Sequence, residues 1–183
     1  MKRPALKRLI LIAAIAMIAG AAGVYAFLAG APDRSAAGVQ SGAAAKDTFP
    51  DLHGQPRRLS DWDADIRVVN FWATWCPPCR EEIPLLVAGQ NKWAAHGVQI
   101  IGIATWDRVE AIRRDTLAQT INYPLLVGDD DAIALMESYG NRAGVLPFTA
   151  VLDRAGRVIA TKKGAFSPGE LDKGLQTFVQ NGG

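Results

Sequence analysis

The sequence predicts an α/β fold with a central mixed β-sheet flanked by helices. Two near-continuous apolar runs, residues 66–72 and 98–104, are typical of buried strands. Helix-start signals follow both runs, and a hairpin over residues 148–161 precedes a last helix at residues 167–180. The order strand, helix, strand, helix, hairpin and final helix predicts a layered α/β sandwich.

Shorter segments complete this prediction. Residues 49–60 indicate an N-terminal strand and hairpin, with a turn rich in Gly and Pro. Asp107 is placed to cap a helix over roughly residues 108–119. A short strand is expected at residues 123–127, before a helix over residues 129–139 that opens with three acids.

The N-terminal part of the chain is predicted to be a membrane anchor. Residues 1–8 hold four Lys and Arg residues and no acid, and residues 9–31 hold no charge at all. At about 1.5 Å per residue, a helix of this length spans the ~30 Å hydrocarbon core of a bilayer. A cleaved signal peptide is the alternative, but its apolar segment is usually only ~7–15 residues long. Pro32 also follows the best small-residue cleavage site, so we expect an uncleaved signal anchor with one transmembrane helix.

The charge pattern indicates the orientation and location of the chain. Basic flanks stay in the cytoplasm, which indicates a single-pass protein of the bacterial inner membrane with its folded domain in the periplasm. Residues 32–45 are small and weakly polar, as in a flexible linker, and residues 46–183 are expected to form one domain. The formal net charge is +2; because the basic flank supplies +4, and Asp33 and Arg34 cancel, residues 46–183 carry −2. This balance gives no support for nucleic-acid binding.

Both cysteines of the chain lie in one motif, Cys76-Pro77-Pro78-Cys79, directly after the first apolar run. If a helix begins here, the two thiols lie one turn apart and are close enough to form a disulfide. The helix N-terminus favours a thiolate on Cys76, which would attack a substrate disulfide, and the more buried Cys79 would then resolve the mixed disulfide. The motif therefore predicts a thiol–disulfide redox site, with the Cys76–Cys79 pair as its redox group and no other cofactor.

Metal binding is the main alternative for paired cysteines. Zinc normally needs four ligands, and the only histidines, His53 and His96, are far from the motif in sequence. Covalent haem attachment requires a His after the second Cys, where this chain has Arg80. A copper-binding or metallochaperone module that uses the two thiols as ligands stays open as an alternative.

Residues 70–84 read Asn-Phe-Trp-Ala-Thr-Trp-Cys-Pro-Pro-Cys-Arg-Glu-Glu-Ile-Pro. This string resembles the thioredoxin superfamily, and in its details the membrane-anchored TlpA/ResA/DsbE-like branch of bacterial thiol-disulfide oxidoreductases. The resemblance extends over residues 46–180. It implies a thioredoxin-like sheet with an N-terminal β-hairpin extension and a TlpA-type β-α insertion.

The resemblance also implies an acid–base residue. General thioredoxins have an acid at the strand position of Asn70, and an amide cannot act as a base. In the TlpA/ResA-like branch, a Glu three residues after the second Cys takes this role, and Glu82 occupies that position on the helical face of Cys79. Burial beside a thiol would raise the pKa of Glu82 toward the working range. The alternative is a solvated helix residue, as we expect for Glu81.

Substrate contacts are implied on either side of the motif. Pro147 resembles the cis-proline of the superfamily, whose loop packs against the cysteines and pairs with substrate through the preceding residue, here Leu146. The alternative is an ordinary proline at the start of a strand. Trp75 is expected in an exposed apolar rim that docks partner proteins, and Pro77 with Pro78 removes two backbone donors from the loop between the thiols.

The resemblance implies a reductase of disulfides in exported proteins, with apocytochrome c maturation as the commonest family role. A reductase in an oxidising compartment must be re-reduced, so a transmembrane electron donor of the CcdA or DsbD type is implied as a partner. A dithiol oxidase on the same fold is one alternative. A peroxidase of the peroxiredoxin type is another, but it requires a Pro and a Thr arranged before one peroxidatic Cys, and Thr74 is only two residues ahead of Cys76.

Overall fold

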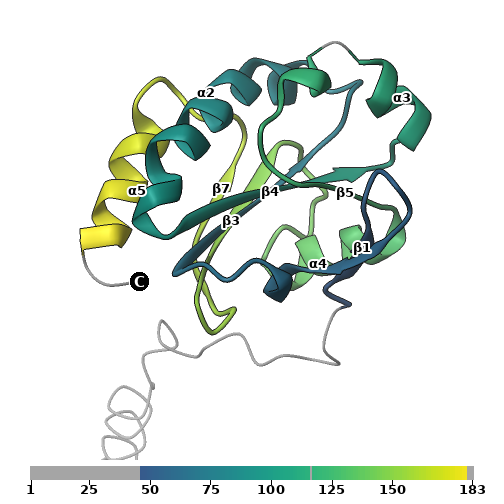
Figure 1. Cartoon of the computed structure of the whole chain (residues 1–183). Coiled ribbons are helices and arrows are strands. Elements are labelled where there is room, and N and C mark those ends of the chain that lie inside the picture. Colours follow the sequence, from purple (N-terminus) through teal and green to yellow (C-terminus); the bar gives the residue numbers. More distant parts are fainter. Residues whose placement is uncertain (1–45, 116, 181–183) are drawn as a thin grey trace, which may run out of the picture. The chain divides into compact units, whose positions relative to one another are not determined.

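The computed structural model describes residues 46–115 and 117–180 (Figure 1). Its strands are β1 Thr48–Pro50, β2 Pro56–Arg58, β3 Ile66–Trp72, β4 Val98–Thr105, β5 Leu125–Gly128, β6 Phe148–Asp153 and β7 Val158–Lys163. Its helices are α2 Pro77–Trp93, α3 Val109–Arg114, α4 Asp130–Ser138 and α5 Glu170–Gln180. The expected segments 1–8, 9–31 and 32–45 lie outside the described residues. Within the part that the structure describes, no helix is long and apolar enough to cross a membrane.

A five-stranded mixed sheet in the order β5-β4-β3-β6-β7 forms the centre of the fold. β3 and β4 pair in parallel, as do β4 and β5, whereas β3–β6 and β6–β7 are antiparallel. β1 and β2 form a separate antiparallel hairpin. The expected central mixed sheet flanked by helices is therefore confirmed.

β3 lies in the middle of the sheet, and all its residues are buried because both of its faces are covered. Ile66 and Val68 pack with residues of α2 and α5, whereas Val69 and Phe71 pack with residues of β1 and α4. Figure 1 shows the same arrangement, with α2 and α5 together on one side of the sheet and α4 on the other. Burial on both faces explains why β3 reads as a continuous apolar run rather than an alternating one.

The helix expected at 108–119 is shorter than predicted. α3 ends at Arg114, because the Asp115 carboxylate accepts hydrogen bonds from the backbone N–H groups of Leu117 and Ala118, both at 2.9 Å. These bonds begin a separate turn instead of continuing the helix. Asp107 does not cap α3 either; the N-cap residue is Arg108, and Asp107 has a different role in the site described below.

Replacing Gly128 with alanine is expected to destabilise the domain by about 1–3 kcal/mol, because the added methyl group overpacks the contact between β1, β5 and α4. A Cβ at this position would lie 2.7 Å from the Cβ of Ala132 and 2.8 Å from the ring of buried Phe49. Gly174 in α5 is the matched control, since a Cβ there meets nothing within 4 Å. Urea unfolding of both variants tests this, and equal stabilities would contradict it.

Candidate active site

The two cysteines form a disulfide at the point where β3 leads into α2, with an S–S distance of 2.05 Å. Cys76 is the N-cap residue of α2, and its sulfur accepts a hydrogen bond from the backbone N–H of Cys79 at 3.3 Å. Pro77 and Pro78 have no N–H, so Cys79 supplies the first free backbone donor of the helix. Once the disulfide is reduced, this donor and the helix N-terminus favour a thiolate on Cys76.

Solvent exposure differs sharply between neighbouring residues of the motif. Cys79 is fully buried and Cys76 is 4% exposed, whereas Pro77 and Pro78 are exposed. The Trp75 side chain, directly before Cys76, is 57% exposed. A second molecule that approaches across Trp75 and the two prolines therefore meets Cys76 and cannot reach Cys79.

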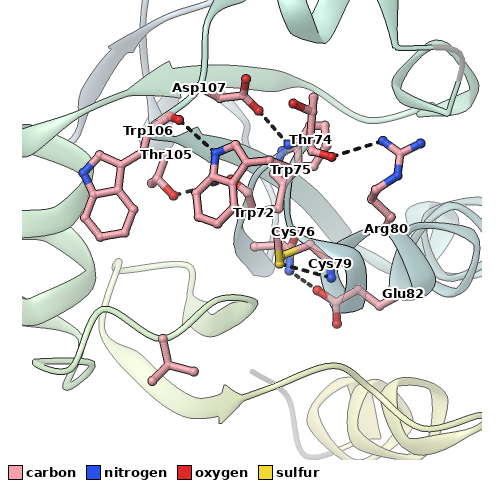
Figure 2. Close-up of a disulfide and its surroundings, with 12 residues drawn as sticks. Trp72, Thr74, Trp75, Cys76, Cys79, Arg80, Glu82, Thr105, Trp106 and Asp107 are labelled. Atoms are coloured by element: carbon pink, nitrogen blue, oxygen red, sulfur yellow. Dashed lines mark hydrogen bonds between the residues drawn. A yellow bond between two sulfur atoms is a disulfide. The ribbon is translucent and has the colours of Figure 1, made fainter.

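The loop between β3 and α2 is held by residues that follow β4 (Figure 2). The backbone N–H of Thr74 donates to the Asp107 carboxylate at 2.6 Å, and the Trp75 indole donates to the backbone oxygen of Trp106 at 3.0 Å. Sequence reasoning missed these contacts. The signal that could have found them is the parallel pairing of β3 with β4, which brings the residues after both strands to one edge of the sheet.

Arg80 fixes the other side of the same loop. Its guanidinium donates to the backbone oxygen of Thr74 at 3.3 Å and forms an ion pair with Asp115. Burial acts to raise the pKa of Asp115, but the hydrogen bonds from the Ala118 N–H and from Arg80 together hold that pKa below its usual value. Thr74 is thus held through both its N–H and its carbonyl oxygen, which fixes the backbone that leads to Cys76.

Trp106 has an unusual backbone conformation, with a φ of 53° that non-glycine residues rarely adopt. Its side chain is 49% exposed, and a Cβ at Gly144 would lie 3.5 Å from its ring. In Figure 2, Trp75 and Trp106 lie on one side of the disulfide and Glu82 lies on the other. Trp106 therefore extends the exposed apolar rim that the sequence predicted for Trp75 alone.

The segment before β6 also reaches the site through Leu146. The Leu146–Pro147 peptide bond is cis, and half-buried Leu146 packs in the cluster that contains both cysteines. Buried Asn141 holds the lead-in, since its side chain donates to the Val145 oxygen at 2.8 Å and accepts from the Val145 N–H at 3.3 Å. The Leu146–Pro147 bond thus has the cis form that the resemblance implies, and Leu146 lies in the cluster around the disulfide.

Glu82 is 1% exposed and is not a solvated helix residue. Its Oε1 atom accepts a hydrogen bond from the Asn70 amide at 2.7 Å, and its Oε2 atom accepts from the backbone N–H of Phe166 at 3.1 Å. Burial raises the pKa of Glu82 from 4.5 to about 7, although both hydrogen bonds and the charge of Lys162 act in the opposite direction. A carboxyl with this pKa can both accept and release a proton near neutral pH.

Asn70 contacts Glu82 from the strand position where general thioredoxins carry an acid. Its amide also donates to the Thr149 hydroxyl at 3.0 Å, so both of its N–H bonds are used. Asn70 therefore orients the carboxyl supplied by α2 and does not itself exchange a proton.

Comparison with known proteins agrees with this geometry. A family model described as the AhpC/TSA family matches residues 41–161. The chain belongs to the AhpC/TSA family. Among relatives in this family, the thiol-disulfide oxidoreductase ResA of Geobacillus thermodenitrificans is 26% identical over 141 residues, which is 76% of this chain and 79% of that protein. ResA of Bacillus subtilis is 25% identical over 117 residues, 64% of this chain and 63% of that protein.

Solved structures show the same fold for this AhpC/TSA family member. A thiol:disulfide interchange protein of the thioredoxin family from Chlorobium tepidum is 26% identical with a TM-score of 0.61, covering 76% of this chain and 99% of that one. A protein from the same organism described as a putative DsbE is 25% identical with a TM-score of 0.60, covering 76% and 95%. The expected thioredoxin-like fold is therefore confirmed. Together with the disulfide at the start of α2, it identifies the chain as a thiol:disulfide oxidoreductase.

Proposed function

We propose that this chain reduces disulfides in exported proteins, with Cys76 as the attacking thiol and Cys79 as the resolving thiol. The observation that carries the proposal is the buried pair of Cys79 and Glu82 on one face of α2, below a Cys76 that borders an exposed apolar rim. This arrangement separates a docking side, where the substrate meets Cys76, from a buried side, where a proton is moved.

The exchange proceeds in two steps that balance in electrons and protons. The Cys76 thiolate attacks one sulfur of the substrate disulfide, a Cys76–substrate bond forms, and the other substrate sulfur leaves as a thiolate. Glu82 then takes the proton of Cys79, and the resulting thiolate attacks the Cys76 sulfur. The second substrate sulfur leaves, the Cys76–Cys79 disulfide forms, and two electrons have passed to the substrate.

The remaining residues of the site serve this exchange in the proposal. Trp75, Pro77 and Pro78 form the exposed surface on which the substrate chain lies, and Leu146 offers its backbone beside Pro147. The redox group is the Cys76–Cys79 pair itself. Because each turnover oxidises this pair, an electron donor must reduce it again, and we propose a transmembrane carrier of the CcdA or DsbD type.

The reduction potential of the full-length protein, equilibrated with a glutathione or dithiothreitol series, tests the direction. The scale runs from about −120 mV for a strong oxidant to about −270 mV for thioredoxin. We expect a value near or below about −200 mV, because a donor of electrons in an oxidising compartment must be more reducing than its substrates. A value near about −120 mV would instead identify a dithiol oxidase on the same fold.

We further propose that residues 9–31 hold the protein in the bacterial inner membrane, with the redox domain in the periplasm. The uncharged apolar run and the basic residues before it support this orientation. Among exported proteins, we propose apocytochrome c as the substrate class of this periplasmic domain. We expect the full-length chain to stay in the membrane fraction after carbonate extraction. We also expect proteases to reach the folded domain from the periplasmic side only. Release of a shortened soluble protein would indicate cleavage instead.

A further inference from the structure

A row of polar side chains crosses the sheet directly under Glu82. In the register of the strands, Asn70 lies opposite Thr149 of β6, and Thr149 lies opposite Lys162 of β7. Residues directly opposite in an antiparallel pair share one face of the sheet. Asn70 donates to both Glu82 and Thr149, so this row leads from the buried carboxyl toward the half-buried Lys162 at the edge strand.

A second set of contacts connects Lys162 to Glu82 through the residues at the start of α5. The Lys162 ammonium pairs with Glu170 at 2.8 Å. The Glu170 carboxylate also accepts hydrogen bonds from the backbone N–H of Ser167 at 3.0 Å and from its hydroxyl at 2.9 Å. The adjacent residue, Phe166, donates its backbone N–H to Glu82. Glu82 and Lys162 are therefore connected in two ways. One connection runs through Asn70 and Thr149 on the sheet, and the other runs through Glu170 and the loop before α5.

We propose that Lys162 and Glu170 are positioning residues of the redox site: their ion pair sets the charge next to Glu82 and thereby the pH range in which Glu82 takes the proton of Cys79. This inference rests on the base role proposed for Glu82. The Lys162 ammonium stabilises the Glu82 carboxylate from β7, whereas Glu170 holds that ammonium in place and offsets part of its charge.

The other titratable groups that face Glu82 come from three elements. α2 contributes the cysteine pair, which has no titratable thiol in the oxidised protein. The segment before β5 contributes Tyr123, whose pKa is raised by burial and then by the Glu82 charge, so the phenol stays neutral. α5 contributes Glu170, whose pKa is lowered to about 2, first by its bond from Lys162, so it stays charged. A titration of the oxidised protein near neutral pH therefore reports on Glu82.

The first test measures the titration of Glu82 directly by carbon NMR of the full-length, oxidised protein labelled at the glutamate carboxyl carbons, with Glu82→Gln to assign the signal. Lys162→Met is expected to raise the midpoint by about 0.5–1 pH unit, the size expected for removal of one partly screened charge. Glu170→Gln keeps an acceptor for Ser167 and is expected to lower the midpoint. Lys163→Met is the matched control, because Lys163 is the adjacent exposed residue of β7 and points to the other face.

The second test follows the reaction. Reduced protein mixed with an aromatic disulfide releases one chromophoric thiolate when Cys76 attacks and a second when Cys79 resolves the adduct. The pH midpoint of the second phase should shift in the same direction as the Glu82 midpoint in each variant. Equal NMR midpoints in Lys162→Met and Lys163→Met would overturn the proposal, as would an unshifted second phase. A Glu82→Gln variant that keeps the wild-type pH profile would show instead that the base role of Glu82 is wrong.

Discussion

Replacing Cys79 with serine is expected to trap the protein as a stable mixed disulfide with its substrate. Cys76 remains at the N-cap of α2 and still attacks, but a serine hydroxyl does not open the Cys76–substrate bond at neutral pH. Release of the substrate should slow by at least about 10³-fold, as for the loss of a nucleophile in other covalent enzymes. Intact-protein mass spectrometry after mixing with a disulfide-containing peptide measures the adduct directly.

The matched variant is Cys76→Ser, which leaves only the fully buried thiol. It should form no adduct on the same timescale, because no substrate sulfur can reach Cys79 through the packed cluster around it. Each variant keeps one of the two sulfurs, so comparing the adducts that they form assigns the roles of Cys76 and Cys79. Faster adduct formation by Cys76→Ser than by Cys79→Ser would reverse the assignment.

Local signals were sufficient to predict most of the fold. Ile66–Trp72 matches its predicted strand because an apolar run buried on both faces is a strong signal. The helix predicted at 108–119 is too long, because the sequence does not show that the Asp115 side chain binds the backbone N–H groups of Leu117 and Ala118. Strand β5, expected at 123–127, is displaced to Leu125–Gly128 because its pairing with β4 sets its limits.

The site was most predictable where one motif contains it. Cys76, Cys79 and Glu82 lie within seven residues of sequence, so their shared helix could be predicted. The partners that hold them come from distant segments: Asp107 reaches Thr74 across 33 positions, and Phe166 reaches Glu82 across 84. Such contacts depend on strand order and register. The alignment of Lys162 on β7 with Thr149 and Asn70 is visible only once the sheet is assembled.

Replacing Glu82 with glutamine is expected to slow the reaction and to stabilise the protein at the same time. A neutral amide cannot take the proton of Cys79, so resolution should slow by about 10²–10⁴-fold. The effect on stability has the opposite sign. Because burial raises the pKa of Glu82 from 4.5 to about 7, the folded state binds the proton more tightly than the unfolded state does. The free energy of unfolding therefore falls as pH rises from about 4.5 to about 7.

Above about pH 7 the buried carboxylate lowers the free energy of unfolding by roughly 3 kcal/mol. This value corresponds to the difference between a pKa of 4.5 in the unfolded state and about 7 in the folded state. Glutamine removes this cost but loses an acceptor for the Phe166 N–H, a loss of about 1 kcal/mol. The variant should therefore be more stable than the wild type by about 2 kcal/mol at pH 8, and slightly less stable at pH 4. Urea unfolding of the oxidised proteins at both pH values measures the two differences.

Glu81→Gln is the control for both effects, because Glu81 is the neighbouring residue of α2 and is exposed. It should change neither the resolution rate nor the pH dependence of unfolding. A Glu82→Gln variant that is less stable than the wild type at pH 8 would show that the carboxylate stabilises the fold, and the residue would then be structural. The expected pattern is the reverse: the carboxylate weakens the fold in the pH range where the reaction needs it. A purely structural residue would not produce opposite changes in stability and rate, so the pair of measurements separates the two roles.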